Sequence, residues 1–250
     1  MIVCKGQAEL DKMREANLIV AKVLKHLGTL IRPGISTKEL DNVAEKMILE
    51  ARGRPAFKGY RGFPASVCTS INDEIVHGIP SRDRVLEQGD ILAVDVGVIY
   101  ESYFGDAAYT YAVDEVSEEL QSLLLVTEQS LYMGIHNVKV GNRVSDISSA
   151  IQKHVEANGF SVVREFVGHG IGKALHEEPQ VPNFGEPGRG PRLVEGMVLA
   201  IEPMVNSKGA GVRILDDNWT AVTADGGYSA HFEHSVAVTQ NGPWILSNLN

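Results

Sequence analysis

Two aspartates lie in β-rich, apolar surroundings within residues 91–113. Asp95 is in the middle of the first apolar run and Asp106 is in the second. With a turn centred between Tyr100 and Glu101, the two aspartates are expected to face each other directly, with Cβ atoms roughly 4.5–5.5 Å apart. Buried carboxylates that close repel each other unless a proton or a cation lies between them. The pair therefore predicts a metal site, although Asp106 alone could also cap a turn.

Four further segments place a charged or imidazole side chain among apolar residues or glycines. His169 stands between two glycines, and His176 precedes two glutamates. Glu202 follows an apolar run typical of a buried strand. Around Glu233, a period of two predicts that this glutamate shares a face with His231. Each of these residues alone is usually a hydrogen-bonded structural residue. Several carboxylates at the ends of apolar strands, together with the glycine-framed histidine, favour a functional site.

The combined ligand set is rich in oxygen and contains no thiolate. Its members are Asp95, Asp106, His169, Glu202 and Glu233. This composition does not suit a structural zinc site, whereas it suits two divalent ions of manganese, iron, cobalt or zinc with bridging carboxylates. A water shared by two such ions ionises near neutral pH and becomes a nucleophile. His77 and His176 remain free to donate to a carbonyl or to a developing oxyanion.

The elements that must position these residues repeat along the chain. Residues 8–27 have helical periodicity, and a second helix capped at Ser36-Thr37 ends near Gly53. After Gly141, Ser145 is expected to cap a corresponding helix that ends at Asn158-Gly159. The β-rich segments are 64–78 and 91–113 in the first half, and 161–168, 197–204 and 229–238 in the second. We expect one domain, 1–250, with two pseudo-symmetric halves at roughly 1–125 and 126–250.

The bulk composition argues against several classes of protein. The chain has 250 residues, of which 44% are hydrophobic and 22% charged, as in ordinary globular proteins. A net charge of −9 without a long basic run argues against binding nucleic acid. Two cysteines do not make a disulfide framework, and neither a signal peptide nor a membrane span is evident. We therefore expect a cytoplasmic protein that does not associate with membranes.

The same residues resemble the type I methionine aminopeptidases. This family has the pita-bread fold, an α/β (α+β) architecture whose two pseudo-two-fold-related halves of helices and antiparallel sheet surround a dinuclear metal site. The resemblance covers nearly the whole chain and rests on segments 60–64, 66–68, 72–80, 94–97, 105–106, 168–172, 176–179, 201–203 and 232–234. It implies removal of the initiator methionine from new polypeptides when the second residue is small, through a hydroxide that bridges two divalent ions.

The resemblance also implies a role for each metal ligand. Asp95 and Glu233 would be carboxylate ligands, and Asp106 and Glu233 would span both ions. His169 and Glu202 would bind the second ion, and Glu202 would also move the proton. The partners would be N-termini of nascent polypeptides near the ribosome, although the acidic net charge gives no support for docking there. We expect a monomer.

Substrate contacts are implied in the same way. His176 would contact the scissile carbonyl, and His77 would contact the substrate near the amide nitrogen. The wall around the first side chain would consist of Tyr60, Phe63, Cys68, Leu175 and Trp219. Thioethers pack well against aromatic edges and soft sulfur, which suits methionine. Cys68 is interpreted as part of this wall and not as a nucleophile, because two metals already supply one.

The chain departs from the family pattern at a few positions. Relatives often carry histidine at Arg61, glycine at Ser102, a polar residue at Phe104, threonine at Ser235 and sometimes an aromatic residue at Leu175.

Three other functions are alternatives. A Xaa-Pro-cleaving enzyme of the same fold would have an extra N-terminal domain. A non-catalytic binding protein would have broken ligand positions, and a dinuclear phosphoesterase would benefit from basic residues beside the metals.

Overall fold

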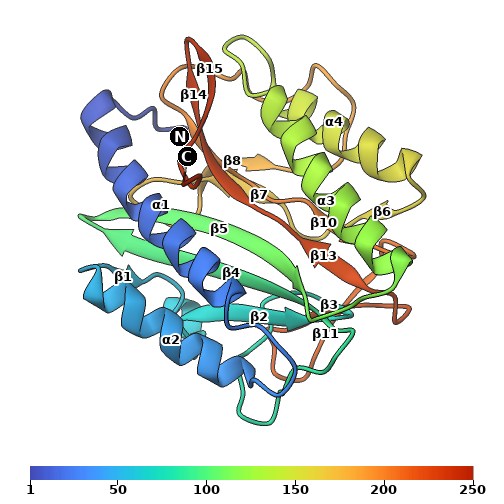
Figure 1. The fold of residues 1–250 in the computed structure, drawn as a ribbon. Helices are drawn as coiled ribbons and strands as arrows, with labels where there is room; N and C mark the ends of the chain where they lie inside the picture. The colour runs from blue at the N-terminus through green and yellow to red at the C-terminus, as the bar shows by residue number, and fades with distance from the viewer. Residues whose placement is uncertain (250) are drawn as a thin grey trace.

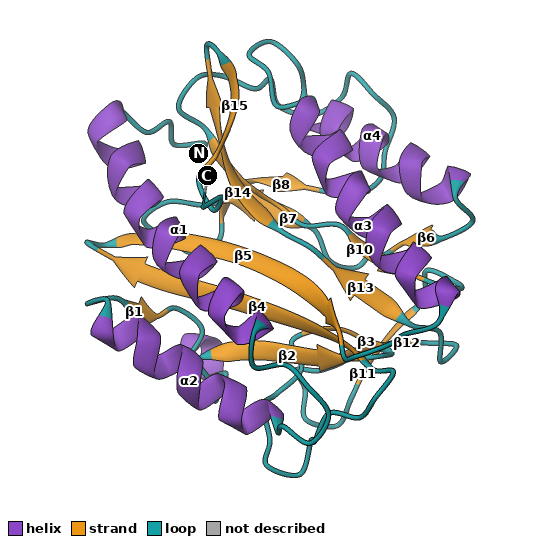
Figure 2. Ribbon diagram, in the orientation of Figure 1, coloured by secondary structure: helices purple, strands orange, loops and turns teal. Residues whose placement is uncertain are grey.

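Long helices lie on the outside of the molecule with the strands between them (Figures 1 and 2). The structure is a computed structural model, which describes residues 1–249. The first half contributes α1 (Gln7–Gly28) and α2 (Thr37–Glu50), and the second contributes α3 (Glu118–His136) and α4 (Val144–Ala157). The repeated order of two helices followed by strands confirms the pita-bread architecture expected from the sequence. The first helix of the second half, α3, begins at Glu118.

The sequence predicted the cap of helix α2 correctly but not that of helix α4. The Ser36 hydroxyl accepts from Glu39 N, and the Glu39 carboxylate accepts from Ser36 N at 3.0 Å, so both ends of a capping box are present at α2. The expected cap of α4 at Ser145 is wrong. The Ser145 hydroxyl donates to Arg189 O at 2.9 Å and is therefore engaged elsewhere, and α4 begins one residue after Arg143.

The strands form antiparallel sheets on either side of the site. The first sheet contains β1 (Arg54–Pro55), β4 (Ile91–Tyr100), β2 (Val67–Ile71) and β5 (Tyr103–Ala112). The second contains β15 (Gly242–Ile245), β14 (His234–Thr239), β9 (Val198–Ile201), β7 (Gly168–Gly170) and β8 (Glu177–Val181). A third, smaller sheet contains β13 (Ser229–His231), β10 (Met204–Asn206) and β6 (Ser161–Val162). A fourth contains β11 (Val212–Ile214), β12 (Ala221–Thr223) and β3 (Glu74–Val76).

The register of the β4–β5 hairpin differs from the expected one. The ladder pairs Asp95 with Ala108 and Asp106 with Gly97. The two-residue turn 101–102 has positive φ angles of 45° and 68°, so its centre lies one residue further along the chain than the sequence suggested. The expectation that the aspartates face each other directly was wrong. They are diagonal neighbours on one face of the sheet, which still keeps their side chains together.

The two halves meet where β5 lies beside the chain between β13 and β14. Glu233 exchanges two backbone hydrogen bonds with Ala108, of 2.9 and 3.4 Å. The Ser235 hydroxyl donates to Asp106 O at 2.8 Å. These bonds place Glu233 of the second half next to Asp106 of the first, so the junction between the halves is also the centre of the site.

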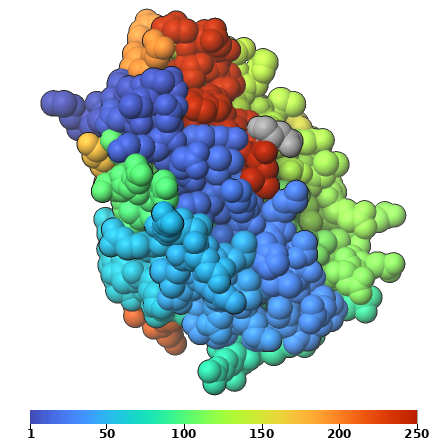
Figure 3. All heavy atoms as spheres, turned by 60° about the vertical axis from the view of Figure 1, so that its left-hand side comes forward, coloured from blue at the N-terminus to red at the C-terminus, as the bar shows by residue number. Residues whose placement is uncertain are grey.

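The helices bury an apolar layer against each half. Helix α1 packs against β4 and β5, and α2 packs against α1, β1 and β2. Val20, Leu27 and Leu40 are fully buried in this layer. Figure 3 shows both helices covering this face, with the C-terminal residues in red beside α1. Arg14 holds that end by donating to Leu246 O and Asn248 O, each at 2.5 Å. Within residues 1–249, no helix combines the length and apolarity needed to cross a membrane.

Candidate metal centre and active site

A cavity of about 300 Å³ lies between the two halves. All twelve residues that the sequence singled out line it: Tyr60, Phe63, Cys68, His77, Asp95, Asp106, His169, Leu175, His176, Glu202, Trp219 and Glu233. They come from both sheets and from the loops between them. The first and last of these residues in the sequence, Tyr60 and Glu233, are 173 positions apart, yet they share one cavity.

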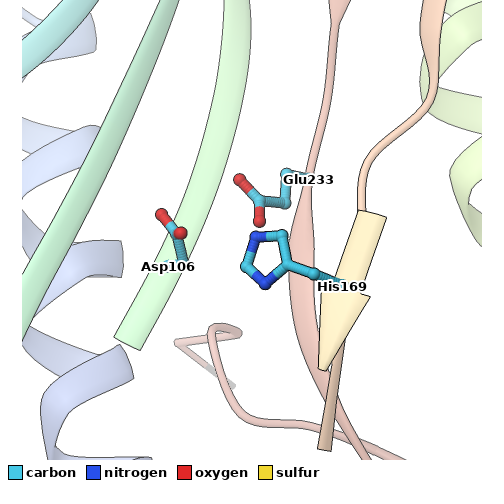
Figure 4. Close-up of side chains that lie close together, drawn as sticks. All are labelled: Asp106, His169 and Glu233. Carbon is cyan, nitrogen blue, oxygen red and sulfur yellow. The ribbon is translucent and has the colours of Figure 1, made fainter. Parts of the chain in front are cut away.

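The cavity floor is made of acidic side chains and one imidazole at the centres and ends of strands. Asp106 projects from β5 and His169 from β7, and Glu233 lies in the break between β13 and β14. One ligand atom from each of these three residues lies within 4.8 Å of the others. Figure 4 shows the three side chains pointing toward one another. Asp95 on β4 and Glu202, immediately after β9, line the same floor.

The glycines around His169 are required by the close approach of neighbouring strands. A Cβ at position 168 would lie 2.3 Å from Ala200 O, and one at position 170 would lie 2.3 Å from Glu178 O. The ring of His169 is oriented by its own chain, because Nδ1 bonds to Gly170 O at 2.9 Å. A carbonyl only accepts, so Nδ1 carries the proton and Nε2 is left as a ligand atom.

Burial raises the pKa of all four carboxyl groups on the floor. Burial takes the pKa of Asp95 to about 7 and that of Glu202 to about 8. For Asp106 and Glu233, burial first and neighbouring carboxylates second raise the pKa well above its usual range. Burial also lowers the pKa of His169 to about 4, so its imidazole is neutral. Four ionised carboxylates cannot coexist here without a compensating positive charge.

This arrangement fits divalent metal ions. The oxygens Asp95 Oδ1, Asp106 Oδ1 and Glu233 Oε1 are buried and have no hydrogen-bond partner within residues 1–249. Unpaired buried carboxylate oxygens are costly, and a cation among them would satisfy them. The donors are carboxylate oxygens and one imidazole nitrogen, which suits divalent ions such as manganese, iron, cobalt or zinc.

His231 also belongs to the cavity, a position for which the sequence suggested only a supporting role. Its Nε2 lies 3.7 Å from Glu202 Oε2 and is otherwise unpartnered within the described chain, while the Glu202 Oε1 atom lies 3.5 Å from His169 Nε2. His234 points away from the cavity and bonds Ser247 Oγ through Nδ1 at 2.8 Å. The alternation of faces around Glu233 predicted this division.

An aromatic and aliphatic wall rises beside the floor. The rings of Phe63 and Trp219 meet edge to face, with centroids 5.1 Å apart, and Leu175 is buried. Cys68 pairs with Asp95 across the β2–β4 ladder. Burial first, and then the charge of Asp95, raise the pKa of the Cys68 thiol well above its usual range. The thiol therefore stays protonated and serves as a soft apolar wall.

Two histidines outside the candidate ligand set stand beside this wall. Burial lowers the pKa of His77 to about 4, and its ring packs edge-on against Phe166 with centroids 5.4 Å apart. His176 lies at the exposed mouth, where its Nδ1 is 2.8 Å from the Tyr60 hydroxyl. Burial first and the Arg61 guanidinium second lower the pKa of His176. Both imidazoles are therefore neutral at pH 7.

Several cavity residues were not identified from the sequence. They are Phe57, Arg61, Val76, Phe166, Val167 and Met204. Arg61 is the one lysine or arginine among the described lining residues, and its guanidinium carbon lies 5.4 Å from the centroid of the Tyr60 ring. Phe166 and Val167 directly precede Gly168 and the glycine-framed His169, so their position in the sequence could have indicated that they line the cavity. The remainder carry no pattern that separates them from core residues.

A buried floor of carboxylates and one imidazole in a pita-bread fold is typical of a metallopeptidase site, and the comparisons with known proteins agree. The sequence pattern of metallopeptidase family M24 matches residues 11–240, and the chain belongs to this family. Methionine aminopeptidase 1 of Bacillus subtilis is 54% identical over 249 residues and covers 100% of both chains. The methionine aminopeptidase of Clostridium acetobutylicum is 52% identical over 247 residues, 99% of each chain. The crystal structure of methionine aminopeptidase from Thermotoga maritima superposes with a TM-score of 0.98, at 44% identity, covering 99% of this chain and 100% of that one.

Proposed function

We propose that the protein is a methionine aminopeptidase, which removes the N-terminal methionine from polypeptides whose second residue is small. The observation that carries this proposal is the combination, in one cavity, of an intact carboxylate and imidazole floor with a soft apolar wall. The full-length similarity to proteins named methionine aminopeptidase supports it.

We infer that the floor holds two divalent ions through Asp95, Asp106, His169, Glu202 and Glu233. When bound, the two ions lower the pKa of a shared water, which supplies hydroxide as the nucleophile at neutral pH. The acidic side chains around the floor would attract the free α-ammonium group of the substrate. Peptides with a blocked N-terminus would lack this interaction.

His176 is proposed to polarise the scissile carbonyl. If the Tyr60 hydroxyl donates to Nδ1 at 2.8 Å, the proton of the neutral imidazole lies on Nε2, which then donates to the carbonyl oxygen. This hydrogen bond strengthens as the carbonyl becomes an oxyanion, so it stabilises the transition state more than the bound substrate.

Glu202 and His77 complete the proposed machinery. The Glu202 carboxylate lies beside both His169 and His231, at 3.5 and 3.7 Å, and is placed to accept the proton of the attacking water. That proton then passes to the leaving amine. His77 stands against Trp219 with ring centroids 6.2 Å apart, and we assign it the substrate amide next to the scissile bond.

The wall of Tyr60, Phe63, Cys68, Leu175 and Trp219 is proposed to hold the methionine side chain. Aromatic edges and a protonated thiol form favourable contacts with a thioether. The exposed rim formed by His176 and Tyr60 borders the path of the second residue. We infer that a bulky second side chain would collide there. We further propose that the enzyme acts as a cytoplasmic monomer on nascent N-termini in the vicinity of the ribosome.

The test is cleavage of three peptides, Met-Ala-Ser, Met-Lys-Ser and Lys-Pro-Ser, with identification of the released amino acid by mass. Each peptide is incubated with untreated protein, with chelator-treated protein, and after add-back of manganese, iron, cobalt or zinc. We expect methionine from the first peptide alone, loss of activity with chelator, and recovery with metal.

Other outcomes would redirect the assignment. Release of lysine from Lys-Pro-Ser would move the enzyme to the proline-directed branch of the fold. Absence of cleavage with every metal would favour a binding protein. Equal release from Met-Ala-Ser and Met-Lys-Ser would contradict the preference for a small second residue.

A further inference from the structure

A buried ion pair beside the cavity has no part in the function proposed above. Lys5 Nζ lies 2.6 Å from Glu177 Oε2, with side-chain exposures of 3% and 14%. The ammonium group also donates to Val3 O at 3.0 Å. Removing two charges from water is costly, and an ion pair of this kind is weak evidence for a contribution to stability. Its position next to His176 suggests a different purpose.

Glu177 connects the pair to the loop that carries His176. Its second oxygen, Oε1, accepts from the backbone N–H groups of Lys173 at 2.8 Å and Ala174 at 3.2 Å. One carboxylate therefore closes the turn 172–177 with one oxygen and contacts Lys5 with the other. Both side chains pack closely on Gly172, because a Cβ there would lie 2.5 Å from Lys5 Cε and 2.6 Å from Glu177 Oε1.

The same turn forms part of the candidate active site. Leu175 is 3% exposed and lines the cavity wall. The ring of His176 lies with its centroid 4.3 Å from that of His169. Lys5 is itself anchored to the body of the protein, because its backbone N donates to Gly196 O at 2.7 Å. The N-terminal segment thus connects a fixed point near β9 to the loop at the mouth.

We propose that Lys5 is a positioning residue for catalysis, which acts through Glu177 to hold the turn 172–177 so that His176 meets the scissile carbonyl. The inference rests on the proposed function, since it requires His176 to act on the substrate. It assigns a role to the N-terminal segment, far in sequence from every residue of the site. Displacing a catalytic group by about 1 Å can cost about 100-fold in rate, so the pair needs to move His176 only slightly to be detected.

The first variant is Lys5→Met, which keeps an apolar stem of similar length and removes the ammonium group. With Met-Ala-Ser as substrate, we expect kcat to fall by about 10-fold to 100-fold, with KM changed by less than about 3-fold. Bound metal should be unchanged. Lys5→Arg restores the positive charge and should recover most of kcat.

A matched control separates positioning from stability. Lys38 forms an ion pair of the same length, 2.6 Å, with the buried Asp41, on the other side of the first sheet. Asp41 in turn accepts from Ser66 N at 2.8 Å. The Lys38 side chain is 34% exposed against 3% for Lys5, so Lys38→Met should lower the melting temperature by less than Lys5→Met does. The kcat of Lys38→Met should remain at the wild-type value when both variants are assayed below their unfolding transitions.

A double-mutant cycle with His176→Ala supplies the decisive readout. If Lys5 acts through His176, Lys5→Met should have little further effect on kcat once the imidazole is gone. If Lys5→Met lowers kcat by the same factor in the wild-type and His176→Ala backgrounds, Lys5 has a general structural role and the inference is overturned. A kcat of Lys5→Met equal to that of Lys38→Met would also overturn it. A wild-type protein that does not cleave Met-Ala-Ser would instead overturn the proposed function.

Discussion

Asp95 and Asp106 lie diagonally across the β4–β5 ladder, Asp95 opposite Ala108 and Asp106 opposite Gly97. The offset leaves each carboxylate opposite a small residue, so neither is pushed against a bulky neighbour. Both side chains project from the same face into the cavity. A diagonal pair is further apart than a directly opposed pair, but both carboxylates remain within reach of one shared site.

Removing the Asp106 carboxylate should abolish the metal centre. Asp106→Ala deletes an acidic group that lies within 4.8 Å of His169 and Glu233 ligand atoms. We expect activity on Met-Ala-Ser to be lost and bound metal, measured by elemental analysis after dialysis, to decrease. Full activity with two metals still bound would show that Asp106 is not a ligand.

Removing the His176 imidazole should impair catalysis without removing metal. The side chain stands at the mouth and bonds the Tyr60 hydroxyl. By analogy with the loss of one oxyanion donor, His176→Ala should lower kcat by about 10²–10³-fold. Metal content is the control measurement, and a decrease in bound metal would make His176 a ligand.

Removing the Tyr60 hydroxyl should weaken the control of the His176 tautomer. In Tyr60→Phe the ring and the apolar wall are kept, but Nδ1 loses its partner at 2.8 Å. A neutral hydrogen bond contributes about 0.5–1.5 kcal/mol, so we expect kcat to fall by about 2-fold to 10-fold with KM for Met-Ala-Ser nearly unchanged. A rise in KM with constant kcat would place Tyr60 in substrate binding alone.

The stability of the chelator-treated protein should decrease as pH rises above neutrality. Asp95 and Glu202, with pKa values raised to about 7 and about 8, bind protons in the folded state that they release in the unfolded state. Stability therefore falls as pH rises through these values. His77 and His169, with pKa lowered to about 4, act in the opposite direction, but only below their unfolded value of 6.5.

The informative window is consequently about pH 6.5–8, which lies above the range in which His77 and His169 act and includes the raised pKa values of Asp95 and Glu202. We expect the melting temperature, followed by circular dichroism, to decrease across this window without metal. With manganese added the decrease should be absent, since the cation replaces the protons and binds better as they leave. A melting temperature that rises with pH in the chelated protein would contradict the assigned pKa shifts.

Much of the site could be predicted from sequence because its chemistry is local. Asp95, Glu202 and Glu233 stand out as charges at or beside apolar strands, and burial of such charges demands a partner wherever the strands lie. The glycines around His169 likewise mark a close backbone approach, which the contacts with Ala200 and Glu178 explain. The helices at 8–27 and after Ser36 were also confirmed, because apolar periodicity and capping are local properties.

Other features depended on long-range contacts. The centre of the hairpin turn was misplaced by one residue, and the pairing register therefore by two, because the turn Glu101-Ser102 adopts positive φ angles without the glycine or asparagine that usually marks them. The cap of α4 was misassigned because the Ser145 hydroxyl is engaged by Arg189, 44 residues away. Phe57 and Arg61 could not be assigned to the cavity until the loops were placed.

Sequence alone determined the kinds of groups on the floor of the site, namely buried carboxylates and a glycine-framed imidazole, because side-chain chemistry and its desolvation cost are fixed by residue type. The apolar wall was expected only from the family resemblance. Only the tertiary structure decided which of them meet. Glu233 reaches Asp106 through its paired hydrogen bonds with Ala108, and Lys5 reaches the His176 loop through Glu177. Such meetings depend on strand pairing between distant segments, whose partners no local pattern in the sequence specifies.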